Sequence, residues 1–129
     1  MYVKTTIQGV FETRAITIDG TYLSPARSQK IHNHSPDGFM WGYEGSGPAQ
    51  LALAILLEYT DEKTATTLYQ DFKREIIAPL PQKDFVLTID VGAWIRSQGI
   101  PGVGTISVTE ESDKWVELII GEEDNDVSE

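Results

Sequence analysis

The sequence GPAQLALAILLEY, residues 47–59, decides how the rest of the chain must be arranged. Alanine and leucine dominate this run, and they are the residues that most favour a helix. Pro48 suits the first turn, because the amide that proline lacks would have no helical partner there, and Gly47 suits the capping position before it. Apolar side chains lie on almost every side of the predicted helix over residues 49–59, so we expect it at the centre of the fold.

Two further helices are predicted after this one. Asp61 is a good N-cap, and Pro79 ends the second helix because it lacks a backbone donor. The apolar residues between them fall on one stripe at helical spacing: Ala65, Leu68, Tyr69, Phe72 and Ile76. A third, short helix is predicted over residues 91–98, with Asp90 as its cap and Gly99 closing it.

Strands are predicted at both ends of the chain. The first two cover residues 2–8 and 14–18, with a turn at Asp19-Gly20, and a C-terminal hairpin covers residues 105–108 and 114–120. Residues 85–89 are either a strand or an approach to the third helix, and residues 39–43 are a short aromatic strand candidate. Residues 23–29 and 31–37 are predicted to be irregular.

Together these elements predict one α+β domain over residues 1–120, in which two to three helices pack on one face of a small antiparallel or mixed sheet. Residues 121–129 hold five of the 20 acidic residues and no base, so we expect an acidic, disordered tail. A chain of 129 residues is long enough for one domain and short for two.

Composition narrows the function classes. The absence of cysteine excludes disulfide frameworks, thiolate zinc sites and cysteine nucleophiles. A formal net charge of -10 disfavours direct nucleic-acid binding, although the first 35 residues are mildly basic. The start of the chain lacks the pattern of a signal peptide, and no apolar run is long enough to span a membrane, so we expect a soluble, cytoplasmic protein.

The distinctive chemistry lies in the glycine-rich segment that opens the central helix. Gly45, Ser46 and Gly47 place free backbone N–H groups and the positive end of the helix dipole together, which suits a phosphate or carboxylate. The pattern is neither a P-loop nor a dinucleotide fingerprint. A tight structural turn in which Ser46 assists the cap is the alternative reading.

Residues around this turn extend the candidate ligand site. Trp41 and Tyr43 could stack on a flat ligand, although with Phe39 they form an alternating aromatic row that is usually core. The cations expected nearby are Arg27 and Lys30, with Arg14 as a third, and solvated surface charge is their alternative role.

His34 is a further candidate ligand-binding residue, and its neighbourhood allows two weaker readings. His32 and His34 with Asp37 could bind a metal, but a hydrogen-bonded loop histidine fits better. Ser35 with His34 and Asp37 invites a hydrolytic triad, yet neighbours so close in sequence rarely hold triad geometry. We therefore expect no metal and no cofactor.

The run GFxWGYxGSGPAQLALA, within residues 33–57, resembles a small domain-of-unknown-function family found in bacteria, archaea, phages and other mobile elements. The family has no activity to transfer. The resemblance implies an accessory gene product of a mobile element or its host.

Three functions follow as hypotheses. The first is a noncatalytic domain that binds an anionic small molecule, such as a nucleotide signal, at the glycine turn. The alternative is an acidic protein-interaction module that imitates DNA and occupies a host protein. An enzyme ranks last, with Glu44 as the one carboxylate to test; oligomeric state stays open.

Overall fold

The structure is a computed structural model that describes residues 4–98 and, of the later residues, the backbone of 116–120. Its elements in chain order are β1 (Thr5–Val10), β2 (Ala15–Ile18), β3 (Thr21–Tyr22), α1 (Ala26–Ile31), α2 (Ser46–Leu57), α3 (Glu62–Phe72), the π-helix η1 (Lys73–Ile77), β4 (Phe85–Ile89), α4 (Val91–Ser97) and β5 (Val116–Ile120).

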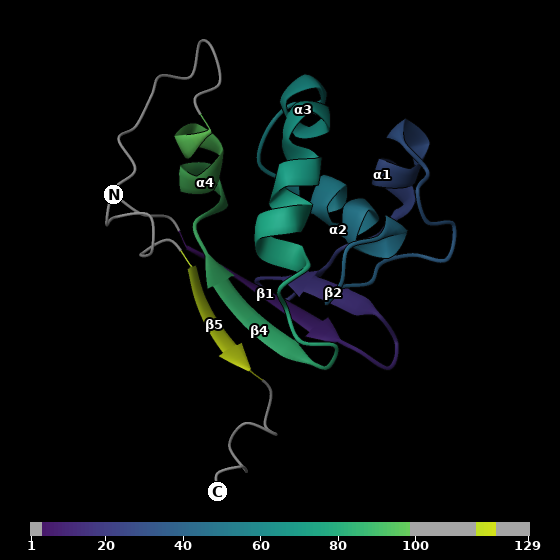
Figure 1. The fold of residues 1–129 in the computed structure, drawn as a ribbon, viewed down its shortest axis with the longest axis vertical. Helices are drawn as coiled ribbons and strands as arrows, with labels where there is room; N and C mark the ends of the chain where they lie inside the picture. Colours follow the sequence, from purple (N-terminus) through teal and green to yellow (C-terminus); the bar gives the residue numbers. More distant parts are fainter. Residues whose placement is uncertain (1–3, 99–115, 121–129) are drawn as a thin grey trace, which may run out of the picture.

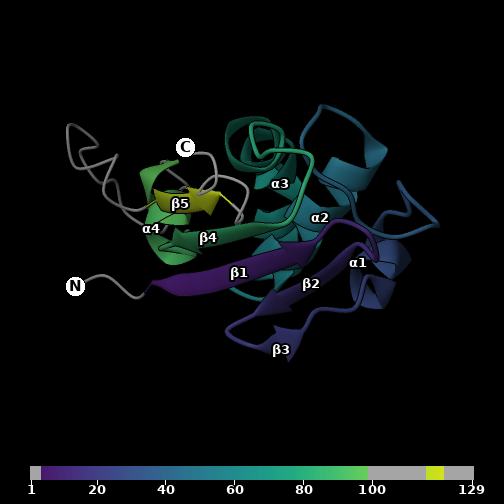
Figure 2. The same cartoon turned by 90° about the horizontal axis from the view of Figure 1, so that it is seen from below.

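The strands form one sheet in the order β3-β2-β1-β4-β5, and every neighbouring pair is antiparallel (Figure 2). The helices lie on one side of this sheet (Figure 1). Burial along β1 alternates accordingly, with Ile7 buried against the helices and Gln8 exposed on the other face. The predicted α+β fold with helices on one face of the sheet is confirmed, although the described residues form more helices than the two or three expected.

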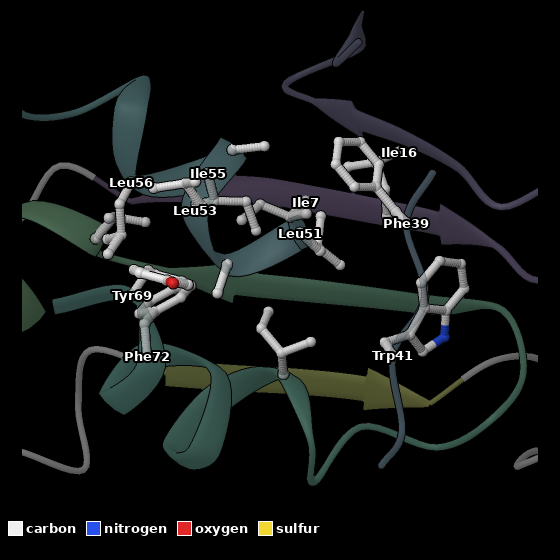
Figure 3. Close-up of a cluster of buried hydrophobic side chains, with 14 of the residues drawn as sticks. Ile7, Ile16, Phe39, Trp41, Leu51, Leu53, Ile55, Leu56, Tyr69 and Phe72 are labelled. Atoms are coloured by element: carbon white, nitrogen blue, oxygen red, sulfur yellow. The ribbon is translucent and has the colours of Figure 1, made fainter. Parts of the chain in front are cut away.

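Helix α2 is the centre of the core. Every residue from Gly47 to Leu57 is buried, and Figure 3 shows Leu51 and Leu53 beside Ile7 of β1. The helix begins at Ser46, earlier than predicted, because the Gly45 carbonyl accepts a hydrogen bond from the Ala49 amide at 3.0 Å and closes the first turn. Pro48 still lies in that first turn, where a missing amide has no helical partner to lose.

The predicted second helix changes its winding halfway. Asp61 caps α3 as expected, accepting from the Thr64 amide at 2.8 Å. After Phe72 the backbone widens into η1, where the Ala78 amide donates to the carbonyl of Lys73, five residues earlier, at 2.8 Å. The extra residue in this turn moves the core position from Ile76 to Ile77, which is 1% exposed.

Two predictions for the first half of the chain were wrong. Residues 23–29 are not irregular throughout, because α1 begins at Ala26, whose amide donates to the Ser24 hydroxyl at 3.1 Å. Residues 39–43 do not form a strand: Gly38 and Gly42 adopt φ values of 111° and 90°, which interrupt an extended backbone.

The remaining elements follow the expectations closely. Strands β1 and β2 correspond to the first two predicted strands, and Asp19 and Gly20, both with positive φ, make the turn into β3. Residues 85–89 are strand β4, and Asp90 caps α4 by accepting from the Ala93 amide at 2.9 Å. Strand β5 pairs with β4, while Gly99, the strand predicted at 105–108 and the acidic tail lie outside the described residues.

Candidate ligand-binding surface

The start of α2 presents two backbone donors without partners. Within the described part of the chain, the amides of Ser46 and Gly47 make no hydrogen bond, and Pro48 has no amide to offer. Ser46 is exposed, whereas Gly47 is buried. An unpaired first turn concentrates partial positive charge, so this end of the helix favours an anion over a cation.

Both glycines of this turn lie against a neighbouring side chain. A Cβ added at Gly47 would lie 2.5 Å from the Cβ of Met40, and one added at Gly45 would meet the ring of Tyr43. Gly45 has a φ of 179°, an extended conformation open to any residue, so its backbone does not require glycine. Packing therefore accounts for both glycines, whereas Ser46 makes no side-chain cap hydrogen bond and the amides of Ser46 and Gly47 have no partner in the described residues.

One turn further along, Gln50 ties the loop before α2 to the helix. Its side chain is fully buried and makes four hydrogen bonds. The Oε1 atom accepts from the amides of His34 and Ser35 at 2.8 and 2.9 Å. The Nε2 atom donates to the Ser28 hydroxyl at 2.9 Å and to the His32 carbonyl at 3.0 Å. Gln50 thus fixes the position of both histidines relative to the helix start.

The histidines stack against a tyrosine from α3. His34 Nε2 and the Tyr69 hydroxyl are 2.7 Å apart. The ring centroids of His32 and Tyr69 are 6.2 Å apart with nearly parallel planes, and those of the two histidines are 5.7 Å apart. Burial lowers the pKa of His34, and the charges of His32 and Lys73 lower it further.

Lysine 73 joins this cluster to the glycine turn. Its ammonium group lies 3.1 Å from a carboxylate oxygen of Glu44, which immediately precedes Gly45. The Lys73 side chain is 15% exposed and that of Glu44 is 54% exposed, so the lysine is mostly enclosed by the protein while the glutamate faces solvent. Lys73 is also the first residue of η1, and such local π turns are frequent at functional sites.

The predicted site residues fall into two groups. His34 and Tyr43 lie in the connection between α1 and α2, Ser46 is the first residue of α2, and Tyr43, whose ring lies against Gly45, is 42% exposed. Trp41, in contrast, is fully buried and donates from Nε1 to the Lys83 carbonyl at 3.0 Å, so its ring is part of the core and is not open to a ligand. Its neighbours there are Phe11 and Phe85.

The predicted cations lie on α1. Arg27 is exposed and its guanidinium is 3.9 Å from Glu58, near the far end of α2. Lys30 is exposed in the last turn of α1. Neither makes a hydrogen bond or an ion pair with the glycine turn in the described residues, whereas Lys73 pairs with Glu44 in the loop before the turn.

The residues that the sequence reasoning missed are Gln50, Tyr69 and Lys73. Gln50 carried a usable signal, since a polar side chain in an otherwise apolar buried helix needs a partner. Tyr69 was assigned to the core stripe, and its hydroxyl gave no hint of a histidine partner. Among the described residues, no three histidine, aspartate or glutamate side chains gather as metal ligands. The His34 ring contacts Tyr69 and not the neighbouring Ser35 hydroxyl.

Comparison with known proteins gives a family without a function. No curated protein and no solved structure matches the chain. In the described part of the chain, no helix has the length and hydropathy that crossing a membrane requires. The profile of a family of unknown function, DUF6166, matches residues 4–97, which include α2, the connection before it, and Tyr69 and Lys73 of the surface described above. The chain therefore belongs to the family of unknown function DUF6166.

Proposed function

We propose that this protein is a noncatalytic domain that binds an anionic small molecule at the start of α2. The observation that carries the proposal is the pair of Ser46 and Gly47 amides that make no hydrogen bond in the described residues and that follow closely after Glu44, the partner of Lys73. The amides would donate to the anion, and the dipole of the 12-residue helix would favour its charge. Lys73 would supply a full positive charge where the anion takes the place of the Glu44 carboxylate that pairs with it.

The exposed Tyr43 ring favours a ligand with a flat part. It lies against Gly45, next to the unpaired amides, and the residue is 42% exposed. An aromatic ring beside an anion site suits a base attached to a phosphate, so a nucleotide or nucleotide-derived signal is the class we propose. In an accessory protein of a phage or mobile element, sequestering such a signal would act against host defence.

The charge of the folded part argues against the DNA-imitating alternative. Residues 4–98 contain 11 acidic and nine basic side chains, a net formal charge of -2 against -10 for the whole chain. A surface that imitates DNA needs dense negative charge, and this part of the chain does not supply it. An interaction module would then have to act through the C-terminal residues.

Isothermal titration calorimetry of the 129-residue protein tests the proposal. The panel contains inorganic phosphate, acetate, and mono-, di- and cyclic nucleotides. Ser46→Asp places a carboxylate at the first helical residue, where it is compatible with the helix but repels an anion. We expect it to weaken binding at least about tenfold, which corresponds to roughly 1.4 kcal/mol.

Thr67→Asp is the matched control, because it makes the same charge change at an exposed position of α3. It should leave affinity within about twofold of the wild type, since exposed charges at a distance are screened. Absence of binding by every anion in the panel, or equal weakening by both variants, would remove the proposal.

A further inference from the structure

The loop over residues 32–36, here the histidine loop, is fastened to the helices through both its backbone and a side chain. Gln50 of α2 holds the amides of His34 and Ser35 and the carbonyl of His32. Gln29 of α1 donates to the Ser35 carbonyl at 2.9 Å. Two further bonds to α1 run from the His32 amide to the Ser28 carbonyl at 2.9 Å and from Gln29 to the Pro36 carbonyl at 3.4 Å. On the α3 side, the His34 ring nitrogen and the Tyr69 hydroxyl are 2.7 Å apart.

The charges around the His34 ring all oppose its protonation. His32 faces it from the same loop, and Lys73 faces it from η1. Glu44, from the loop before α2, pairs with Lys73, and among the described residues no carboxylate pairs with either histidine. Tyr69 is the titratable group facing it from α3, and α2 contributes none, since its sequence is SGPAQLALAILL.

We propose that the histidine loop is a proton-operated latch, seated on Gln50 and Tyr69 while His34 is neutral and released when His34 takes up a proton. Release lets the imidazolium reach water and move away from His32 and Lys73, which removes two like-charge contacts and the cost of burying a charge. The backbone bonds to Gln50 are then exchanged for bonds to water, while the apolar contacts of α2 remain.

The direction of the pH effect follows from the pKa of His34, which is lower in the seated loop than its ordinary value of 6.5. The seated state therefore binds fewer protons than the released state below that value. The preference for the seated loop is complete above pH 6.5 and is lost as the pH falls through 6.5 toward the seated pKa. This inference concerns the loop itself and does not depend on ligand binding.

Amide hydrogen exchange followed by NMR between about pH 7.5 and about pH 5 tests the latch, because it reports local opening residue by residue. In the wild type we expect the protection factors of the His34 and Ser35 amides to fall at least about threefold over this range, while those of Leu53 in α2 stay constant. In His34→Gln, whose side-chain amide can still donate to the Tyr69 hydroxyl but does not titrate, the fall should be absent.

Lys73→Met gives a second readout if the glutamine variant folds poorly. It removes one like charge and leaves every hydrogen bond of the histidine loop in place, so the pH-dependent fall should become smaller than in the wild type. Protection of the His34 and Ser35 amides that stays constant down to about pH 5 would overturn the latch, as would an equal fall in His34→Gln.

Discussion

Replacing Gln50 with methionine should cost this protein a large part of its stability. Methionine keeps the length and volume of glutamine, so α2 retains its packing and the change isolates the four hydrogen bonds of the side chain. A typical intramolecular hydrogen bond contributes about 0.5–1.5 kcal/mol, and a buried polar group left without a partner costs about 1–3 kcal/mol.

These values set the expected loss. The four bonds alone amount to roughly 2–6 kcal/mol. The histidine loop can lift and let water reach the amides of His34 and Ser35, so part of the desolvation cost is recovered. The apolar methionine also gains from burial. We therefore expect a decrease of about 2–4 kcal/mol in the free energy of unfolding, a substantial share of the roughly 5–15 kcal/mol of a domain.

Urea unfolding followed by tryptophan fluorescence measures this loss, because Trp41 and Trp94 are both buried. Gln70→Met on α3 is the matched control: its side chain makes no hydrogen bond in the described residues, and it should change stability by less than about 0.5 kcal/mol. A loss below about 1 kcal/mol in Gln50→Met, with unchanged exchange of the His34 and Ser35 amides, would refute the assigned role of Gln50.

Two further predictions concern the ends of the helices. Hydrogen bonds from Thr64 lower the pKa of Asp61 in the folded protein. The stability that Asp61 contributes is therefore present above its ordinary pKa and is lost as the pH falls through the folded pKa. Asp61→Asn keeps the cap but does not titrate, so the urea midpoint of this variant should depend less on acid pH than that of the wild type. Gly47→Ala should lower the free energy of unfolding by about 1–3 kcal/mol, because the new methyl group meets Met40. Gly45→Ala should cost less than about 1 kcal/mol, because its methyl group meets only the half-exposed Tyr43 ring, which can rotate. Equal unfolding midpoints for the two variants would contradict this difference.

The sequence predicted the parts of the fold that depend on local signals. The apolar run of α2, the cap at Asp61 and the alternation in Arg14–Ile18 each act within a few residues, and each indicated its element correctly. Helix α1 was missed because Ser24-Pro25 at the start of that segment suggested an irregular backbone. These two residues instead lead into the helix, where the Ser28 hydroxyl donates to the Pro25 carbonyl at 2.9 Å.

Tertiary contacts account for the other differences. The wide turn at Lys73 has no sequence signal of its own, yet it moves the buried position from Ile76 to Ile77. The aromatic row from Phe39 to Tyr43 alternates as a strand would, but the positive φ of Gly42 turns Tyr43 outward while Trp41 stays in the core. The contact of His34 with Tyr69 joins residues 35 apart, beyond the reach of any local pattern.

The segment from Asn33 to Gln50 can now be divided by what packing explains. Met40 against Gly47 requires glycine there, and the loop requires the polar side chain of Gln50. Packing gives no such account of Ser46, which is exposed, makes no side-chain hydrogen bond in the described residues and lies beside free amides. Packing does not explain the exposed Tyr43 ring either.

The residues to test for function are therefore those whose identity the packing of the fold does not explain. If Ser46 and Tyr43 bind a ligand, their substitution should abolish binding and leave the free energy of unfolding unchanged. Gln50→Met should instead lower the free energy of unfolding and weaken binding only as far as it frees the histidine loop. Ligand binding that follows stability across all three variants would mean that the whole segment serves the fold and that the ligand site lies elsewhere.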